Sequence, residues 1–115
     1  MPVQLCLILQ KSISEHHYSE RALRFAEQAV AAGHKINCVF FYRSAVNHAK
    51  TELSGSAQAL QQKWQTWSTQ QQVPLIVCHT VAERMGLSDF APGYQDAGLT
   101  ALVQAMASAD RTLQF

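Results

Sequence analysis

Short apolar runs alternate along the chain with longer segments in which apolar residues recur every three or four positions. The runs at residues 3–9, 35–42 and 73–78 have the length of strands, and their nearly continuous apolar character indicates burial on both faces. A last short run at 111–115 predicts a strand at the end of the chain. Helical periodicity predicts helices over roughly 19–32, 57–69, 80–86 and 98–108. The remaining segments predict loops at 11–18 and 87–97 and one or two helical turns at 44–50.

Capping signals mark the ends of two of these helices. Ser19 is a candidate N-cap for the first helix, and Gly33 is a candidate C′ residue at its end. Thr80 and Glu83 have the spacing of a capping box, so a helix is expected to begin just after Cys78.

The alternation of strands and helices predicts an α/β fold, with a mainly parallel sheet of four to five strands covered by helices. The chain has the length of a single domain, residues 1–115. In such sheets, ligands and chemistry gather beyond the carboxyl ends of the strands. Tyr42 and Cys78 are expected at that edge, and the loop at 11–18 is expected to open onto it.

Composition excludes several function classes. Hydrophobic residues make up 48% of the chain and charged residues 15%, against about 25% charged in typical soluble domains. The low charge indicates that part of the surface is covered by partner chains. A net charge of +1 offers no basic face for direct nucleic-acid or membrane binding. No apolar stretch approaches the ~20 residues of a membrane span, and no signal peptide is recognisable, so a cytoplasmic location is expected.

The three cysteines lie in different settings. Cys6 and Cys38 fall inside apolar strands, where a small buried residue is the expected interpretation. Cys78 instead lies where a strand meets a capped helix, and the N–H groups at a helix start favour the reactive thiolate. A nucleophilic cysteine also needs a nearby base or cation. Three residues are candidates for tuning the thiolate, namely His79, Arg84 and His48.

Metal and nucleotide chemistry find little support. The five histidines and three cysteines lack the spacing of a zinc site, and no CxxC pair is present. The segment after the first strand, residues 10–14, contains no glycine, whereas a phosphate cradle needs glycines for close backbone approach. No metal or organic cofactor is therefore expected. Trp64 and Trp67 are expected to pack on the sheet or at a subunit contact.

Three blocks of sequence together resemble the DsrE/TusD family of sulfur-relay proteins. The first runs from Gly33-His34 through Val39-Phe-Phe-Tyr-Arg43 to Val46 and Asn47. The second is Ile76-Val-Cys78 to Ala82, followed by Arg84, Gly86 and Asp89. The third is Gly98-Leu99, Ala101-Leu102 and Ala105, followed by Asp110-Arg111 and Gln114-Phe115. The blocks follow in the family's order, but residues 11–17 replace its usual glycine-containing turn after the first strand.

The resemblance implies a three-layer α/β/α sandwich and a sulfurtransferase of the bacterial cytoplasm. Cys78 would accept sulfane sulfur as a persulfide from an upstream donor protein and pass it to a downstream acceptor protein. The pathway would be 2-thiolation of the wobble uridine in tRNA or dissimilatory sulfur oxidation. Family members form hexamers of related chains, so a homo- or hetero-oligomer is implied, and the divergent loop at 11–18 would affect partner choice or assembly.

Two other interpretations stay open at this point. In the first, the chain is a non-catalytic assembly subunit, in which Cys78 is a strand-end thiol and the tryptophan face builds an interface. In the second, it is a small-ligand binding domain with a pocket at the sheet edge. An exposed, acidic Cys78 is needed by the sulfur carrier alone.

Overall fold

A computed structural model describes residues 2–115, which form an α/β fold around a five-stranded sheet. The strands are all parallel and lie in the order β4-β3-β2-β1-β5. Their bounds are Gln4–Leu9 for β1, Lys35–Phe41 for β2, Leu75–Cys78 for β3, Tyr94–Ala97 for β4 and Arg111–Gln114 for β5. The predicted parallel α/β architecture is therefore confirmed.

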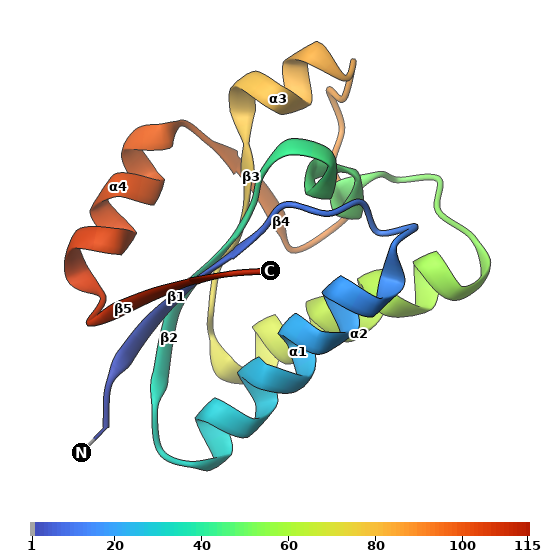
Figure 1. Cartoon of the computed structure of the whole chain (residues 1–115). Helices are drawn as coiled ribbons and strands as arrows, with labels where there is room; N and C mark the ends of the chain where they lie inside the picture. Colours follow the sequence, from blue (N-terminus) through green and yellow to red (C-terminus); the bar gives the residue numbers. More distant parts are fainter. Residues whose placement is uncertain (1) are drawn as a thin grey trace.

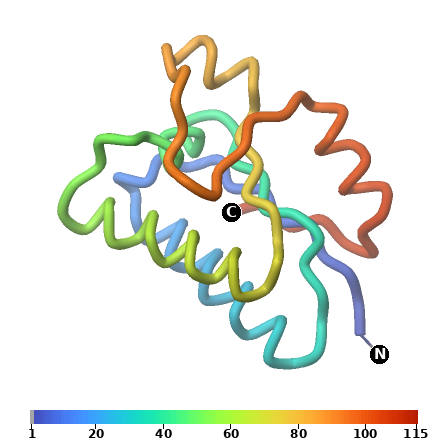
Figure 2. Tube along the Cα trace, turned by 180° about the vertical axis from the view of Figure 1, so that it is seen from behind, coloured from blue at the N-terminus to red at the C-terminus, as the bar shows by residue number. Residues whose placement is uncertain are grey.

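Helices cover both faces of this sheet. Their bounds are His16–Ala31 for α1, Gly55–Gln71 for α2, His79–Arg84 for α3 and Leu99–Ser108 for α4, and a 3-10 helix, η1, spans Arg43–Ala49. Helices α1 and α2 lie on one face and α4 on the other, giving three layers (Figure 1). Helix α3 and η1 lie together beyond the carboxyl ends of the strands, as the view from behind also shows (Figure 2).

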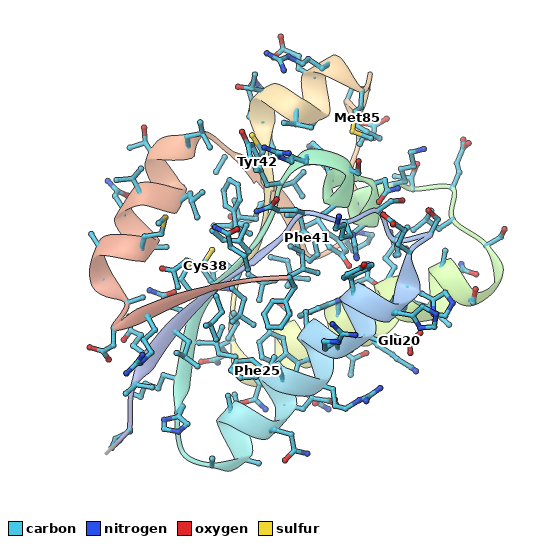
Figure 3. All side chains as sticks on the ribbon, in the orientation of Figure 1. Glu20, Phe25, Cys38, Phe41, Tyr42 and Met85 are labelled. Atoms are coloured by element: carbon cyan, nitrogen blue, oxygen red, sulfur yellow. The ribbon has the colours of Figure 1, made fainter. Side chains whose placement is uncertain are left out.

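The core follows from the apolar strands. Strands β1 and β2 are buried on both faces along most of their length, because helices pack on each side. The side chain of Cys38 points to the α4 layer, whereas Phe41 points to the side of α1 and α2 (Figure 3). There the ring of Phe41 meets Trp64 edge to face, with centroids 5.8 Å apart, and Trp64 meets Trp67 in the same way. The expected packing of the two tryptophans on the sheet is confirmed.

The predicted loop at 87–97 was wrong at its carboxyl end, because residues Tyr94–Ala97 form β4. This strand pairs in parallel with β3, and Cys78 lies in register with Ala97. Only Tyr94 of its four residues is buried, since β4 forms an edge of the sheet. An edge strand this short and polar lacks the apolar alternation by which strands are recognised.

The predicted cap at Ser19 was also wrong. Helix α1 begins at His16, so Ser19 lies inside the helix, where it is buried. Its hydroxyl bonds to two buried side chains instead of capping the backbone. At the other end of α1 the expectation is confirmed, because Gly33 follows the helix with a φ of 91°, in the left-handed region.

The loop after β1 lies beside η1. Asn47 binds it at two points: its side-chain oxygen accepts a hydrogen bond from the Ile13 N–H at 2.9 Å, and its amide donates to the Ser12 hydroxyl at 2.6 Å. The predicted opening of this loop onto the carboxyl edge is confirmed. Among residues 2–115, no helix combines the length and the apolar character that crossing a membrane requires.

Candidate functional site

Cys78 is the last residue of β3 and the N-cap of α3. The helix begins at His79, directly after the cysteine, two residues earlier than the expected capping box would place it. No side-chain cap bond is present, so the Thr80–Glu83 box was wrong. The side chain of Cys78 is buried, with 1% of the residue exposed, so the thiol is not open to solvent in this conformation.

His79 lies on the outer side of this edge, where both of its ring nitrogens contact carboxylates. Its Nδ1 is 2.7 Å from Oδ2 of Asp96 on β4, and its Nε2 is 2.9 Å from Oε2 of Glu83, one turn further along α3. The hydrogen bond with Asp96 raises the pKa of His79, and the charges of Asp96 and Glu83 raise it further, against the opposing effect of desolvation.

His48, the second tuning candidate, belongs to η1 and is fully buried. Its Nδ1 donates to the carbonyl of Ala45 at 2.7 Å, and its Nε2 is 2.8 Å from the hydroxyl of Ser19. Burial lowers the pKa of His48 to about 4, so the ring is neutral at pH 7. Both nitrogens are thus occupied by partners other than Cys78.

Arg84, the third tuning candidate, is exposed in the last turn of α3. It pairs with no carboxylate within residues 2–115, and over the same residues no hydrogen bond joins Arg84, His79 or His48 to the sulfur of Cys78. The structure therefore brings the three candidates to the same end of the sheet as the cysteine but into other contacts. Their role in tuning the thiolate stays a prediction.

The other two cysteines form a buried pair. Cys6 on β1 lies in register with Cys38 on β2, and at most 1% of either residue is exposed. The hydrogen bond with Cys6, followed by burial, raises the pKa of the Cys38 thiol, which keeps it protonated. These residues occupy the interior of helix-covered strands, as the sequence predicts.

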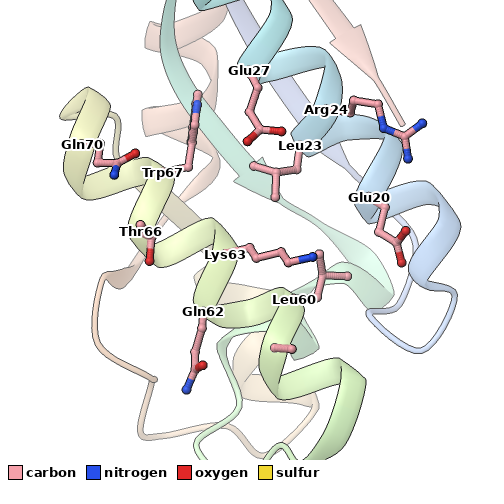
Figure 4. Close-up of a pocket in the computed structure, with 11 residues that line it drawn as sticks. Glu20, Leu23, Arg24, Glu27, Leu60, Gln62, Lys63, Thr66, Trp67 and Gln70 are labelled. Atoms are coloured by element: carbon pink, nitrogen blue, oxygen red, sulfur yellow. The ribbon is translucent and has the colours of Figure 1, made fainter.

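A groove of about 530 Å³ lies between α1 and α2 (Figure 4). Leu23, Leu60 and Trp67 contribute its apolar surface, and side chains such as Glu20 and Lys63 form its polar walls. No residue of β3, α3 or β4 lines this groove, so it is separate from the edge at Cys78. The small-ligand alternative needs a pocket at the sheet edge, and this groove lies elsewhere.

Asp96 is the site residue that sequence reasoning missed. Asp96 was missed because the sequence predicts an irregular loop over the residues that form β4. A residue in an irregular loop has no predicted neighbour on another strand. Once a strand is placed over Tyr94–Ala97, the parallel register sets Asp96 opposite Val77, one residue before Cys78. A polar strand that begins just after Pro92 and Gly93 was the available signal, and it is a weak one.

Comparison with known proteins identifies the fold and the family. The crystal structure of the ychN protein from E. coli superposes with a TM-score of 0.74 over 100% of both chains, at 24% identity, which shows the shared fold.

Three curated relatives bear the name sulfurtransferase TusD. The protein from Sodalis glossinidius is 31% identical, with 100% of both chains covered. The one from Erwinia tasmaniensis is 33% identical, covering 98% of this chain and 100% of its own. The one from Salmonella arizonae is 36% identical, covering 82% and 85%.

The family model described as DsrE/DsrF-like matches residues 4–115, which includes every strand and helix of the structure. Full-length relatives named sulfurtransferases classify this chain as a sulfurtransferase with a general role in sulfur relay. On the match of the family model and of these relatives, the chain belongs to the DsrE/DsrF-like family.

Proposed function

We propose that this chain accepts sulfane sulfur as a persulfide on Cys78 and passes it to a partner protein. The observation that carries the proposal is the position of Cys78, which is the carboxyl end of β3 and the N-cap of α3. Reactive groups of parallel α/β sheets gather at this edge. Cys6 and Cys38 lie instead within strands that helices cover on both faces.

The proposed transfer needs only thiol chemistry. The thiolate of Cys78 attacks the outer sulfur of a donor persulfide, the donor's S–S bond breaks, and the donor leaves as a thiolate. A thiolate of the acceptor then attacks the outer sulfur on Cys78, which leaves as a thiolate in turn. Each step exchanges one S–S bond for another, so neither an external oxidant nor a cofactor is required. We infer that the relay operates in the cytoplasm, in tRNA wobble-uridine thiolation or in sulfur oxidation.

Persulfide loading tests this proposal directly. Wild-type protein is incubated with glutathione persulfide or with a cysteine desulfurase and cysteine, and the mass is measured on the intact chain and on its peptides. We expect one added sulfur on the peptide that contains Cys78. Cys78→Ser should abolish it, and Cys38→Ala, the matched control, should retain it. Absence of loading from both donors, or loading on another cysteine, would refute the persulfide carrier.

The non-catalytic assembly subunit is the second candidate, and the burial of Cys78 favours it. A sulfur carrier must present its thiol, whereas a structural cysteine stays covered. The two candidates give opposite results in the loading experiment. A chain that assembles with a related, cysteine-bearing partner but accepts no sulfur itself would be the assembly subunit.

We infer further that the chain assembles with copies of itself or with related chains, with a hexamer as the expected state. Helix α4 buries none of its residues and carries no charge, and 48% of Leu99, 62% of Val103 and 41% of Met106 are exposed. Apolar residues gathered on one helix are typical of a protein contact. Val103→Glu should lower the sedimentation coefficient of the assembly, whereas Gln104→Glu on the same helix should leave it unchanged. Equal sedimentation of the two variants would refute a contact through α4.

A further inference from the structure

Three charged side chains form a cluster on the outer side of the sheet edge beside Cys78. The ring of His79 joins them, because its Nδ1 binds Asp96 and its Nε2 binds Glu83. Glu83 and His79 belong to α3, whereas Asp96 belongs to β4. The His79–Asp96 contact is therefore a side-chain link between the short helix after Cys78 and the neighbouring edge strand.

Both contacts together require a charged ring. Ionised carboxylates can only accept hydrogen bonds, so each nitrogen of His79 must donate one. A neutral imidazole carries a single N–H, and its other nitrogen would face a carboxylate with a lone pair. Loss of the proton must therefore break one of the two contacts. The raised pKa of His79 agrees with this geometry.

No other charged group competes for His79 on the elements that pack against it. Helix η1 contributes Arg43, which is exposed, and His48, whose nitrogens bind Ser19 and Ala45. Helix α3 itself contributes Arg84, which pairs with no carboxylate within the described residues 2–115. Strand β3 contributes Cys78, whose thiol is buried. The charge state of His79 is set by Asp96 and Glu83.

The link lies where the proposed chemistry needs access. Sulfur transfer requires the outer sulfur of a donor to reach the Cys78 thiol, yet only 1% of Cys78 is exposed. The helix that follows it has six residues and buries only Ala82, so few apolar contacts hold it in place. Because α3 begins directly after Cys78, movement of α3 away from β4 would change the surroundings of the cysteine, and the contact between His79 and Asp96 opposes that movement.

We propose that Asp96 is a positioning residue of the sulfur site: by binding Nδ1 of His79, it ties the start of α3 to β4 and keeps Cys78 covered until this contact opens. Its importance for sulfur relay rests on the proposed function of Cys78. The contact itself can be tested without any sulfur donor, so the two proposals can fail separately.

Alkylation of Cys78 by iodoacetamide measures how often the site opens. Peptide mapping after timed labelling gives a separate rate for each of the three cysteines. We expect Asp96→Ala to raise the rate at Cys78 about two- to five-fold at pH 7, the size expected for loss of one partly exposed ion pair. Cys6 and Cys38 should stay unlabelled over the same period in both proteins, because exposing those thiols requires global unfolding, which remains rare after the loss of one contact.

The pH profile separates this role from general destabilisation. His79 is charged below its ordinary pKa, so the contact is complete there, and it weakens as the pH rises through the raised pKa in the folded protein. The ratio of the Cys78 rate in Asp96→Ala to that in wild type should therefore be largest near pH 6 and decrease at high pH. Asp96→Asn, which keeps an acceptor oxygen without the charge, should lower the pKa of His79 in an NMR titration.

The matched control is Glu20→Gln. It removes the charge from a second histidine–carboxylate contact, His16 Nδ1 to Glu20 Oε1 at 2.8 Å on α1, whose side chains are similarly exposed. This variant should label Cys78 at the wild-type rate. An unchanged Cys78 rate in Asp96→Ala, a rate ratio independent of pH, or labelling of Cys6 and Cys38 as fast as that of Cys78 would each overturn the proposal. Failure of persulfide loading alone would refute the carrier and leave this inference standing.

Discussion

Ser19 is the centre of a buried hydrogen-bond network whose proton positions follow from the structure. The Trp64 indole N–H donates to the Ser19 hydroxyl at 2.8 Å. The carbonyl of Ala45 can only accept, so Nδ1 of the neutral His48 carries the ring proton. Nε2 of His48 is then an acceptor and receives the Ser19 O–H at 2.8 Å. One hydroxyl therefore satisfies two buried polar groups, one as an acceptor and one as a donor.

Ser19→Ala removes both of these bonds at once. Trp64 and His48 are each 0% exposed, so neither the indole N–H nor Nε2 can turn to water. Each unsatisfied buried group costs about 1–3 kcal/mol. Allowing for partial relaxation of the side chains, we expect the free energy of unfolding to fall by about 2–4 kcal/mol, a large share of the ~5–15 kcal/mol typical of a domain.

Urea unfolding followed by tryptophan fluorescence measures this loss, and Trp64 lies within the network. Ser56→Ala is the matched control, because Ser56 is exposed in the first turn of α2 and should change stability by no more than about 0.5 kcal/mol. A loss below about 0.5 kcal/mol in Ser19→Ala would refute the assigned network, since relaxation or water would then have replaced both bonds.

Three further predictions concern other parts of the fold. Burial lowers the pKa of His48 to about 4 from an ordinary 6.5, so the unfolded chain binds more protons than the folded chain between these pH values. Protonation of this residue should therefore lower the free energy of unfolding by about 3 kcal/mol as the pH falls from 7 to 4. NMR should find the ring of His48 neutral at pH 5. Protonation of His48 near pH 6.5 would contradict this. Asn47→Ala should lose about 1–2 kcal/mol and speed amide exchange at Ile13, whose N–H it binds; unchanged exchange there would count against the contact. Gly33→Ala should cost about 1–2 kcal/mol from the positive φ alone, since a Cβ would meet no atom within 4 Å; an unchanged melting temperature would show that the turn relaxes.

The strands and helices that could be predicted are those with a strong local pattern. The runs around Leu7, Val39 and Val77 are apolar because helices cover both faces of these strands. A continuous apolar run is a local pattern, so these strands can be predicted from the sequence alone. Strand β4 is different, because its place is decided by pairing with β3 and its side chains remain largely exposed. Pairing of this kind depends on the backbone, so its four residues need no distinctive composition.

The chemistry of single polar residues was predicted less well for a related reason. Ser19 has the same local features as a helix cap, and only the approach of Trp64 and His48 from elsewhere in the chain makes it a buried network residue. His79 and Asp96 are 17 residues apart and meet only through the β3–β4 register. Such contacts are tertiary, whereas capping rules consider neighbours along the chain alone.

Burial of the thiol does not by itself distinguish the three cysteines, since 0–1% of each is exposed. What differs is the structure that must move before a reagent can reach each sulfur. Cys6 and Cys38 lie between helix layers, so exposing them means disrupting the core, at a cost near the full stability of about 5–15 kcal/mol. Cys78 lies at a strand end, directly before a six-residue helix with one buried side chain, so we expect a local opening to expose it at a lower cost. The position of Cys78 in the chain therefore sets the free-energy cost of reaching it, and under the proposed relay this cost, more than its exposed area, would decide which cysteine exchanges sulfur with a partner.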